Sequence, residues 1–296
     1  MQSKLLSLFI KGQLSALRRC RFIGATDLPE IMANSTERLL NLPGKLPFFA
    51  TRATEPRLVH ELLGKLHPVE CGRPLIRMGP EGDGGYLVPD DLEGIGACFS
   101  PGVSDVAGFE LDCANRGMEV FLADASVEKP PCSHPSFRFA KKFIGATTGG
   151  KFVSLEDWVG AETKLADKDL LLQMDIEGFE YEAFLTASTA LLQRFRIMVV
   201  EFHDLERLFC EPLFPFYRLV FEKLLATHTC VHIHPNNYCS LIKVAGLEML
   251  QMAEFTFVRN DRVRPAGYAR QFPHPLDRDN TLREHVVLPP AYYRTK

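Results

Sequence analysis

The stretch Asp169-Leu-Leu-Leu-Gln-Met-Asp175-Ile-Glu177-Gly178-Phe-Glu180 decides the fold of this chain. Its apolar half, 170–174, has the length of a strand that is buried on both faces of a parallel sheet. Three carboxylates around a glycine follow at once. Ligands of open α/β sheets bind beyond the carboxyl ends of the strands, so this turn predicts a functional site near Asp175. The alternative is that Glu180 only caps the next helix and Asp175 only closes a turn.

Strands and helices alternate on both sides of this stretch. Strands are predicted at 86–88, 97–100, 119–123, 137–144, 197–202, 230–234 and 255–258. Helices are predicted at 56–65, 106–116, from Ser154, at 181–187 and at 213–226. This order is typical of a mostly parallel sheet with helices on both faces. No apolar run reaches the roughly 20 residues that a membrane-spanning helix needs.

Prolines divide the chain into an N-terminal helical extension (1–57), an α/β domain (58–264) and an irregular C-terminal tail (265–296) that we expect to pack on the domain. Residues 1–26 carry five basic side chains and no acidic one, in a pattern typical of an amphipathic helix. Such a helix packs on the domain, lies at a membrane surface or serves as an organelle presequence. We predict a cytoplasmic protein, or a mitochondrial one if the helix is a presequence.

Composition argues against several partners. The formal net charge of −3 and the absence of a basic block give no attraction to nucleic acid. The 8 cysteines are scattered without a CxxC pair, which favours free buried thiols over a disulfide framework or a zinc site.

A glycine turn and a later carboxylate suggest an adenosine-containing cofactor. Gly102 follows one predicted strand, and Asp124 ends the next, 22 positions later. That spacing resembles the separation between a glycine turn and a ribose-binding acid. The GxGxxG of dinucleotide enzymes is absent, so a pyrophosphate cradle is not expected. S-adenosylmethionine has no phosphate and fits better. The alternative is that Gly102 is only a turn residue and Asp124 only ends an edge strand.

The segment Gly82-Asp83-Gly84-Gly85 has two interpretations. Its backbone could approach a ligand closely, or it could be an ordinary hairpin connection.

Polar residues also end the two following strands. Alternation places Glu201 and His203 on one side of their strand, at the same sheet edge as Asp175. The next strand ends with His234, Asn236 and Asn237. A histidine can accept a proton near neutral pH, and an asparagine can orient a hydroxyl-bearing substrate. A second interpretation is a divalent metal held by Asp175, Glu201, His203 and His234.

The D-I-E-G-F-E segment at 175–180 resembles the signature of the FkbM-type methyltransferases. Matches elsewhere in the chain support this resemblance over about residues 58–293: 82–86, 99–103, 109–110, 154–158, 201–203, 232–237 and the tail residues 275–277 and Asn280. The chain departs from the family pattern at Ser100-Pro101 and at Asp124-Ala125-Ser126.

The resemblance implies a Rossmann-like class I methyltransferase sheet of seven strands, mostly parallel, with the last strand antiparallel. It implies that Gly102 and Asp105 line the methionine part of S-adenosylmethionine, that Asp124 holds the ribose and that Asp175 lies beside the methyl sulfonium. We place Asp83 and Gly84 at the cofactor as well. Asp175 or His203 would take the proton of the acceptor.

The predicted activity is S-adenosylmethionine-dependent methylation of a hydroxyl on a sugar or small metabolite, by in-line displacement. The residues predicted to contact the acceptor are Glu177, Glu201, His234, Asn236 and Asn237. Two alternatives are a non-catalytic methyltransferase-like binding module and a metal-dependent hydrolase or sugar-modifying enzyme. A nicotinamide enzyme ranks last because the glycines are missing.

Overall fold

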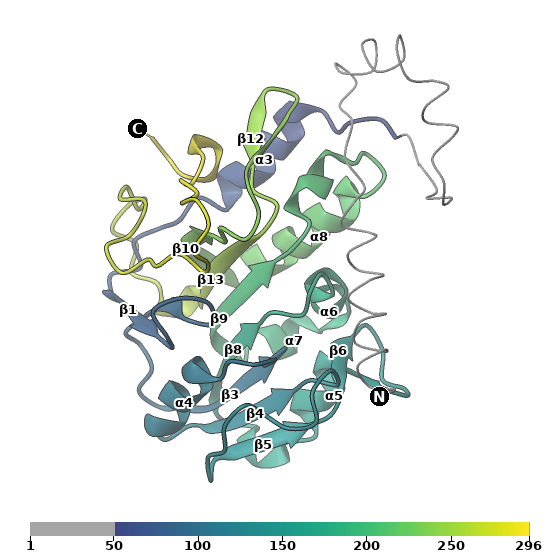
Figure 1. The fold of residues 1–296 in the computed structure, drawn as a ribbon, viewed down its shortest axis with the longest axis vertical. Coiled ribbons are helices and arrows are strands. Elements are labelled where there is room, and N and C mark those ends of the chain that lie inside the picture. The colour runs from purple at the N-terminus through teal and green to yellow at the C-terminus, as the bar shows by residue number, and fades with distance from the viewer. Residues whose placement is uncertain (1–50, 296) are drawn as a thin grey trace.

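The computed structural model describes residues 51–295, which form one seven-stranded sheet with helices on both faces (Figure 1). The order across the sheet is β10-β13-β9-β8-β3-β4-β5. These strands are β3 (Ile95–Pro101), β4 (Glu119–Ala123), β5 (Phe137–Ala140), β8 (Asp169–Met174), β9 (Phe195–Phe202), β10 (His228–Pro235) and β13 (Ala253–Arg259).

The direction of the strands matches the sequence prediction. Strands β9, β8, β3, β4 and β5 are parallel to one another. β13 is antiparallel to both β9 and β10. A mostly parallel sheet of seven strands whose last strand is antiparallel is therefore confirmed.

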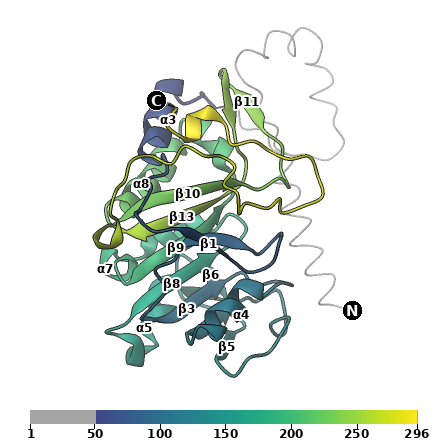
Figure 2. The same ribbon diagram turned by 90° about the vertical axis from the view of Figure 1, so that its left-hand side faces the viewer.

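Two hydrophobic clusters cover the two faces of the sheet. One face carries α3 (Pro56–Lys65), α5 (Leu155–Gly160), α6 (Glu180–Thr186), α7 (Thr189–Leu192) and α8 (Phe214–Leu225). The other carries α4 (Gly108–Asn115) and the hairpin of β1 (Leu75–Met78) and β2 (Tyr86–Pro89) (Figure 2). Leu170 and Leu172 pack into the first cluster and Leu171 into the second, as expected of a strand buried on both faces.

One predicted strand is wrong. Residues 137–144 were expected to form a single strand, but they form β5 in the main sheet and β6 (Phe143–Gly145) in a separate pair with β7 (Phe152–Ser154). The exposed Lys141 and Lys142 separate them, and the amide of Lys142 donates to the carbonyl of Ala140 in a tight turn. The chain thus leaves the main sheet after Ala140.

Several short elements were not predicted. β11 (Ile242–Val244) and β12 (Leu247–Met249) form a hairpin whose two turn residues, Ala245 and Gly246, have positive φ. Single-turn helices complete the fold: η1 (Thr163–Leu165), η2 (Leu205–Phe209), η3 (Asn260–Arg262) and η4 (Pro290–Tyr292).

After residue 264 the chain contains only η4 and otherwise runs irregularly past β10 and β13 (Figure 2). Tyr292 is fully buried, and its hydroxyl accepts from the amide of Leu250. Nearly all of the predicted extension at 1–57, including the basic helix, lies outside the described residues, so the three-part division stays a prediction. Within residues 51–295, no helix is long and apolar enough to cross a membrane.

The ends of β3 and β8 meet at Gly102, which has a φ of +90°. A Cβ atom there would lie 1.6 Å from the carbonyl oxygen of Asp175. The first turn after β3 and the acidic turn after β8 therefore touch through their backbones, and only glycine allows this contact.

We expect Gly102→Ala to destabilise the chain by about 1–3 kcal/mol more than Gly117→Ala, because overpacking adds to the backbone strain. Gly117 is a matched control: its φ is +87°, and a Cβ added there would have no other atom within 4 Å. Equilibrium urea unfolding measures both variants. Equal losses would show that the close contact with Asp175 contributes nothing.

Candidate functional site

The acidic turn after β8 is organised by the side chain of Glu180. This carboxylate is fully buried, and its Oε1 accepts from the amides of Ile176 and Gly178 at 3.1 Å each. Glu177 and Gly178 have positive φ, so the turn reverses tightly just before α6. Glu180 therefore stabilises the turn, whereas the structural interpretation of the sequence had it cap the next helix; α6 has no side-chain cap hydrogen bond.

The same carboxylate orients a histidine from the next strand. Nδ1 of His203 lies 3.1 Å from Oε1 of Glu180, and the hydroxyl of Tyr181 donates to the carbonyl of His203. The other ring nitrogen, Nε2, faces Oε1 of Glu201 at 3.5 Å, Oδ1 of Asp175 at 3.7 Å and Oε2 of Glu177 at 3.9 Å.

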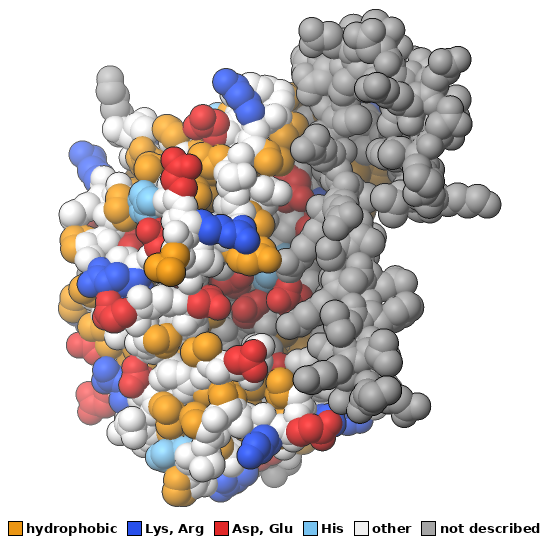
Figure 3. Space-filling view, in the orientation of Figure 1, with side chains coloured by type: hydrophobic (Ala, Val, Ile, Leu, Met, Phe, Trp, Pro, Cys, Tyr) orange, Lys and Arg blue, Asp and Glu red, His pale blue; other side chains and the backbone are white. Residues whose placement is uncertain are grey.

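We refer to Asp175, Glu177, Glu180 and Glu201 around His203 as the carboxylate cluster. Figure 3 shows acidic side chains gathered near the middle of the face, close to the ends of β8 and β9, with a histidine beside them. The cluster unites four of the residues predicted from sequence.

Burial and mutual repulsion shift the ionisation of the carboxylate cluster. Burial raises the pKa of Asp175 to about 7; His203 opposes this shift, and Glu177 and Glu180 add to it. Burial also raises the pKa of Glu201, with Asp175 adding to the effect. Although burial lowers the pKa of His203, the surrounding carboxylates hold it well above its usual value.

A row of buried polar residues continues across the sheet from the cluster. Glu201 on β9, Glu254 on β13 and His234 on β10 are paired in register, so their side chains share one face. The amide of Asn236 donates to both oxygens of Glu201 at 3.2 Å. Asn280 of the tail donates to Oε1 of Glu254 at 2.7 Å.

His234 turns toward the tail rather than toward the cluster. Its Nδ1 lies 3.6 Å from Oδ2 of Asp277, whose Oδ1 accepts from Nε2 of His232 at 2.8 Å. Burial lowers the pKa of His234, but Asp277 and Glu254 raise it above its usual value.

Asn237 is also committed to the tail. Its Nδ2 donates to the carbonyls of Thr281 and Arg283, and its Oδ1 accepts from the amide of Thr281. The side chain is 2% exposed. The tail occupies the donors and the acceptor of this amide, and the predicted contact of Asn237 with the acceptor substrate stays a prediction.

The residues predicted to hold the cofactor lie at the same sheet edge, on the other side of β8. Asp124 ends β4, and its two oxygens accept from the amides of Ser104 at 3.0 Å and Ser126 at 2.7 Å. Asp105 is exposed in the turn that follows Gly102. The predicted contacts of Asp124, Gly102 and Asp105 with a cofactor stay predictions.

The glycine segment at 82–85 is a hairpin connection. Met78 pairs with Tyr86 across it. A Cβ at Gly84 would lie 2.9 Å from Cγ1 of Val106, so the loop packs against the turn after β3. Asp83 is exposed, with its Oδ1 3.4 Å from Nδ2 of Asn280. The hairpin interpretation is therefore correct, and the loop still borders the site.

A buried polar chain behind the site was not predicted. Oγ of Ser100 lies 2.5 Å from Oε1 of Glu110 and 2.7 Å from Oε1 of Gln173. Nε2 of Gln173 donates to the hydroxyl of Tyr86 at 3.1 Å. The hydroxyl of Ser100 has one proton for these two acceptor oxygens, and a protonated Glu110 carboxyl would supply a second one. Polar residues inside apolar strands were the signal in the sequence.

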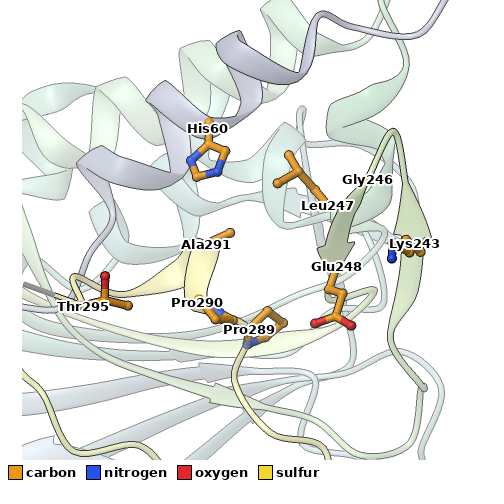
Figure 4. A pocket seen from close by; sticks show the side chains of 9 residues that line it. All are labelled: His60, Lys243, Gly246, Leu247, Glu248, Pro289, Pro290, Ala291 and Thr295. Atoms are coloured by element: carbon orange, nitrogen blue, oxygen red, sulfur yellow. The ribbon is translucent and has the colours of Figure 1, made fainter.

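A cavity of about 430 Å³ lies elsewhere, between α3, the β11–β12 hairpin and η4 (Figure 4). Its lining includes His60, Lys243, Glu248 and Ala291. None of the residues predicted for the site contributes to it.

Residues 144–254 match the family model of the methyltransferase FkbM domain. The resemblance to the FkbM-type methyltransferases is confirmed. The matched FkbM segment contains the acidic turn, Glu201 and His203, which build the carboxylate cluster, and it also contains the end of β10.

Solved structures similar to this chain include two proteins that are described as methyltransferases. One is a protein from Anabaena variabilis that its description assigns to the methyltransferases of an antibiotic biosynthesis pathway. It is 13% identical, with 65% of this chain and 67% of that chain covered and a TM-score of 0.28. The other is the Pyrococcus abyssi tRNA (uracil-54, C5)-methyltransferase in complex with S-adenosyl-L-homocysteine. It is 12% identical, with 62% of this chain and 43% of that chain covered and a TM-score of 0.25. Neither TM-score supports an argument about this chain, and no curated protein matches it.

The buried chain behind the site predicts a pH-dependent stability. Burial raises the pKa of Glu110 from 4.5 to about 7, so ionising this group opposes folding. The stabilisation of the folded state by the neutral Glu110 carboxyl is fully present below pH 4.5 and is lost as the pH rises through about 7. The loss is on the order of 3 kcal/mol.

We expect Glu110→Gln to reduce the decline in stability by this amount, because the amide stays neutral; the raised pKa of Asp175 leaves a remaining decline. Urea unfolding of the variant and the wild type from pH 4.5 to 8 measures it, with the exposed Glu93→Gln as control. A decline of the same size in Glu110→Gln would assign the pH dependence to another group.

Proposed function

We propose that this chain is an S-adenosylmethionine-dependent methyltransferase that methylates a hydroxyl of a sugar or another small metabolite. The observation that carries the proposal is the carboxylate cluster, which lies at the carboxyl ends of β8 and β9 within the segment that matches the FkbM domain. Open α/β sheets bind their ligands at this edge.

The cofactor would lie across the ends of β3 and β4. Asp124 would bind the ribose hydroxyls with its remaining lone pairs, and Gly102 and Asp105 would line the methionine part. When bound, S-adenosylmethionine supplies a methyl group on a positively charged sulfur. Because Gly102 touches the backbone of Asp175, the methionine side of this site borders the carboxylate cluster.

The acceptor would bind between this cofactor site and the buried row of Glu201, Glu254 and His234. Methyl transfer to a hydroxyl requires orientation of the oxygen and removal of its proton. Asp175, whose backbone touches Gly102, and His203 in its neutral form are our candidates for the proton acceptor. The amide of Asn236 orients the carboxylate of Glu201. This carboxylate would accept a hydrogen bond from the hydroxyl of the substrate that receives the methyl group.

The two alternative functions, a non-catalytic binding module and a metal-dependent hydrolase or sugar-modifying enzyme, are less well supported. A binding module without activity would not need a buried row of ionisable groups beside a cofactor site. A metal-dependent hydrolase would use the same cluster, but the match to the FkbM domain favours methyl transfer.

We expect Asp124→Asn to weaken binding of S-adenosylhomocysteine about tenfold or more, because a neutral amide loses charge-assisted hydrogen bonds to the ribose. Isothermal titration calorimetry measures the affinity, with Asp90→Asn, an exposed residue that directly follows β2, as the matched control. Unchanged affinity in Asp124→Asn would refute the ribose contact. No binding of the cofactor to the wild type would refute the proposed function.

We expect Asp175→Asn to reduce methyl transfer by about 100-fold or more while S-adenosylhomocysteine affinity changes little. Transfer of a labelled methyl group to a panel of sugars and hydroxylated metabolites measures the activity. Wild-type turnover in Asp175→Asn would remove this carboxylate from the chemistry.

A further inference from the structure

The orientation of His203 leaves one ring nitrogen directed into the carboxylate cluster. Nδ1 is held by Glu180, and the ring is 8% exposed. A histidine whose Nδ1–H donates to a carboxylate presents the lone pair of Nε2 on its other side. This carboxylate–histidine pairing is typical of metal-binding histidines, whose tautomer and direction it sets.

The distances at Nε2 fit a shared cation better than hydrogen bonds. Three carboxylate oxygens, from Glu201, Asp175 and Glu177, lie 3.5–3.9 Å from this nitrogen, at or beyond the limit for a hydrogen bond. Two neighbouring ligands of an octahedral cation, each bound at about 2.1 Å, lie about 3 Å apart. A contraction of less than about 1 Å would bring these atoms to that spacing.

Two buried carboxylate oxygens in the cluster also have no hydrogen-bond partner. Oδ1 of Asp175 and Oε2 of Glu180 are buried without a hydrogen bond, and the side chain of Glu180 is fully buried. Leaving buried charge unpaired is unfavourable by several kcal/mol. Among residues 51–295, no lysine or arginine forms an ion pair with Asp175, Glu180 or Glu201; only His203 does.

We propose that the carboxylate cluster binds one divalent cation, of which Mn²⁺ is a suitable probe. Its ligands would be Nε2 of His203 and carboxylate oxygens of Asp175 and Glu201, and Glu180 would position the histidine. Ligand atoms of Asp175, Glu180 and His203 already lie within 4.8 Å of one another. Mixed carboxylate and imidazole ligands suit such ions. His234, which the sequence placed in this ligand set, faces Asp277 instead.

A bound cation restricts the class of substrate that could receive the methyl group. Three protein ligands leave further positions of a six-coordinate ion open. An acceptor with two neighbouring oxygen atoms, such as a vicinal diol, would fill two of them. This narrowing rests on the proposed function, whereas cation binding itself requires neither cofactor nor acceptor.

The test is Mn²⁺ binding by the full chain after removal of metals with a chelator. Electron paramagnetic resonance of free Mn²⁺ gives the affinity and stoichiometry, and we expect one site per chain that Mg²⁺ competes for. Electron spin echo modulation of the bound ion should show a coupled ¹⁴N nucleus from the imidazole. Absence of saturable binding, or a bound ion without nitrogen coupling, would overturn the proposal.

Single variants assign the ligands. Asp175→Asn and His203→Gln should each weaken Mn²⁺ binding at least tenfold, and Glu180→Gln about 10- to 100-fold through the histidine. Glu182→Gln is the matched control, since it removes the same charge from an exposed position on the same helix. Circular dichroism confirms that each variant is folded. Equal weakening in Glu182→Gln and Asp175→Asn would show a diffuse charge effect and overturn the site.

S-adenosylhomocysteine binding measured on the same samples separates this inference from the proposed function. Cofactor binding without Mn²⁺ binding would overturn only the cation site. Mn²⁺ binding with nitrogen coupling but without cofactor binding would support the cation site and overturn only the proposed methyl transfer.

Discussion

The buried carboxylate of Glu180 is the interaction on which the rest of the site depends. One oxygen accepts two backbone amides of the turn after β8 and contacts the imidazole of His203 after β9. An apolar side chain at this position would leave these donors unsatisfied in a buried place, at about 1–3 kcal/mol each. The helix that follows, α6, packs through Tyr181, whose hydroxyl reaches the carbonyl of His203. Two strand ends are thereby joined by one residue.

A second constraint links this cluster to the first half of the sheet. Gly102 and the backbone of Asp175 are in direct contact, so the turn after β3 and the turn after β8 cannot move independently. The carboxylate of Asp124 ties the turn after β3 to the end of β4 through the amide of Ser104. The strand ends thus form one connected edge. A small ligand bound at β3 and β4 would lie beside the carboxylate cluster without any domain closure.

The far side of the edge is built by the tail. Asn237 binds the backbone at residues 281 and 283, and Asn280 returns to Glu254. Asp277 of the tail contacts Nε2 of His232. These contacts with the tail hold Glu254 and the other ionisable side chains in a buried row next to the carboxylate cluster. Carboxylates outnumber basic groups there, so the edge attracts positive charge. A sulfonium cofactor and a divalent cation both satisfy that requirement.

The sequence by itself determined the sheet and the location of its functional edge. The apolar run at 170–174 and the alternation of elements predicted a mostly parallel sheet, because burial on two faces leaves a local pattern. The D-I-E-G-F-E segment indicated the acidic turn in the same way. Only the tertiary structure decided that Asn237 binds the tail, that Glu254 and Asn280 join the site and that residues 137–144 divide between two sheets. These features depend on cross-strand register and on contacts between residues far apart in the chain, which no local pattern records.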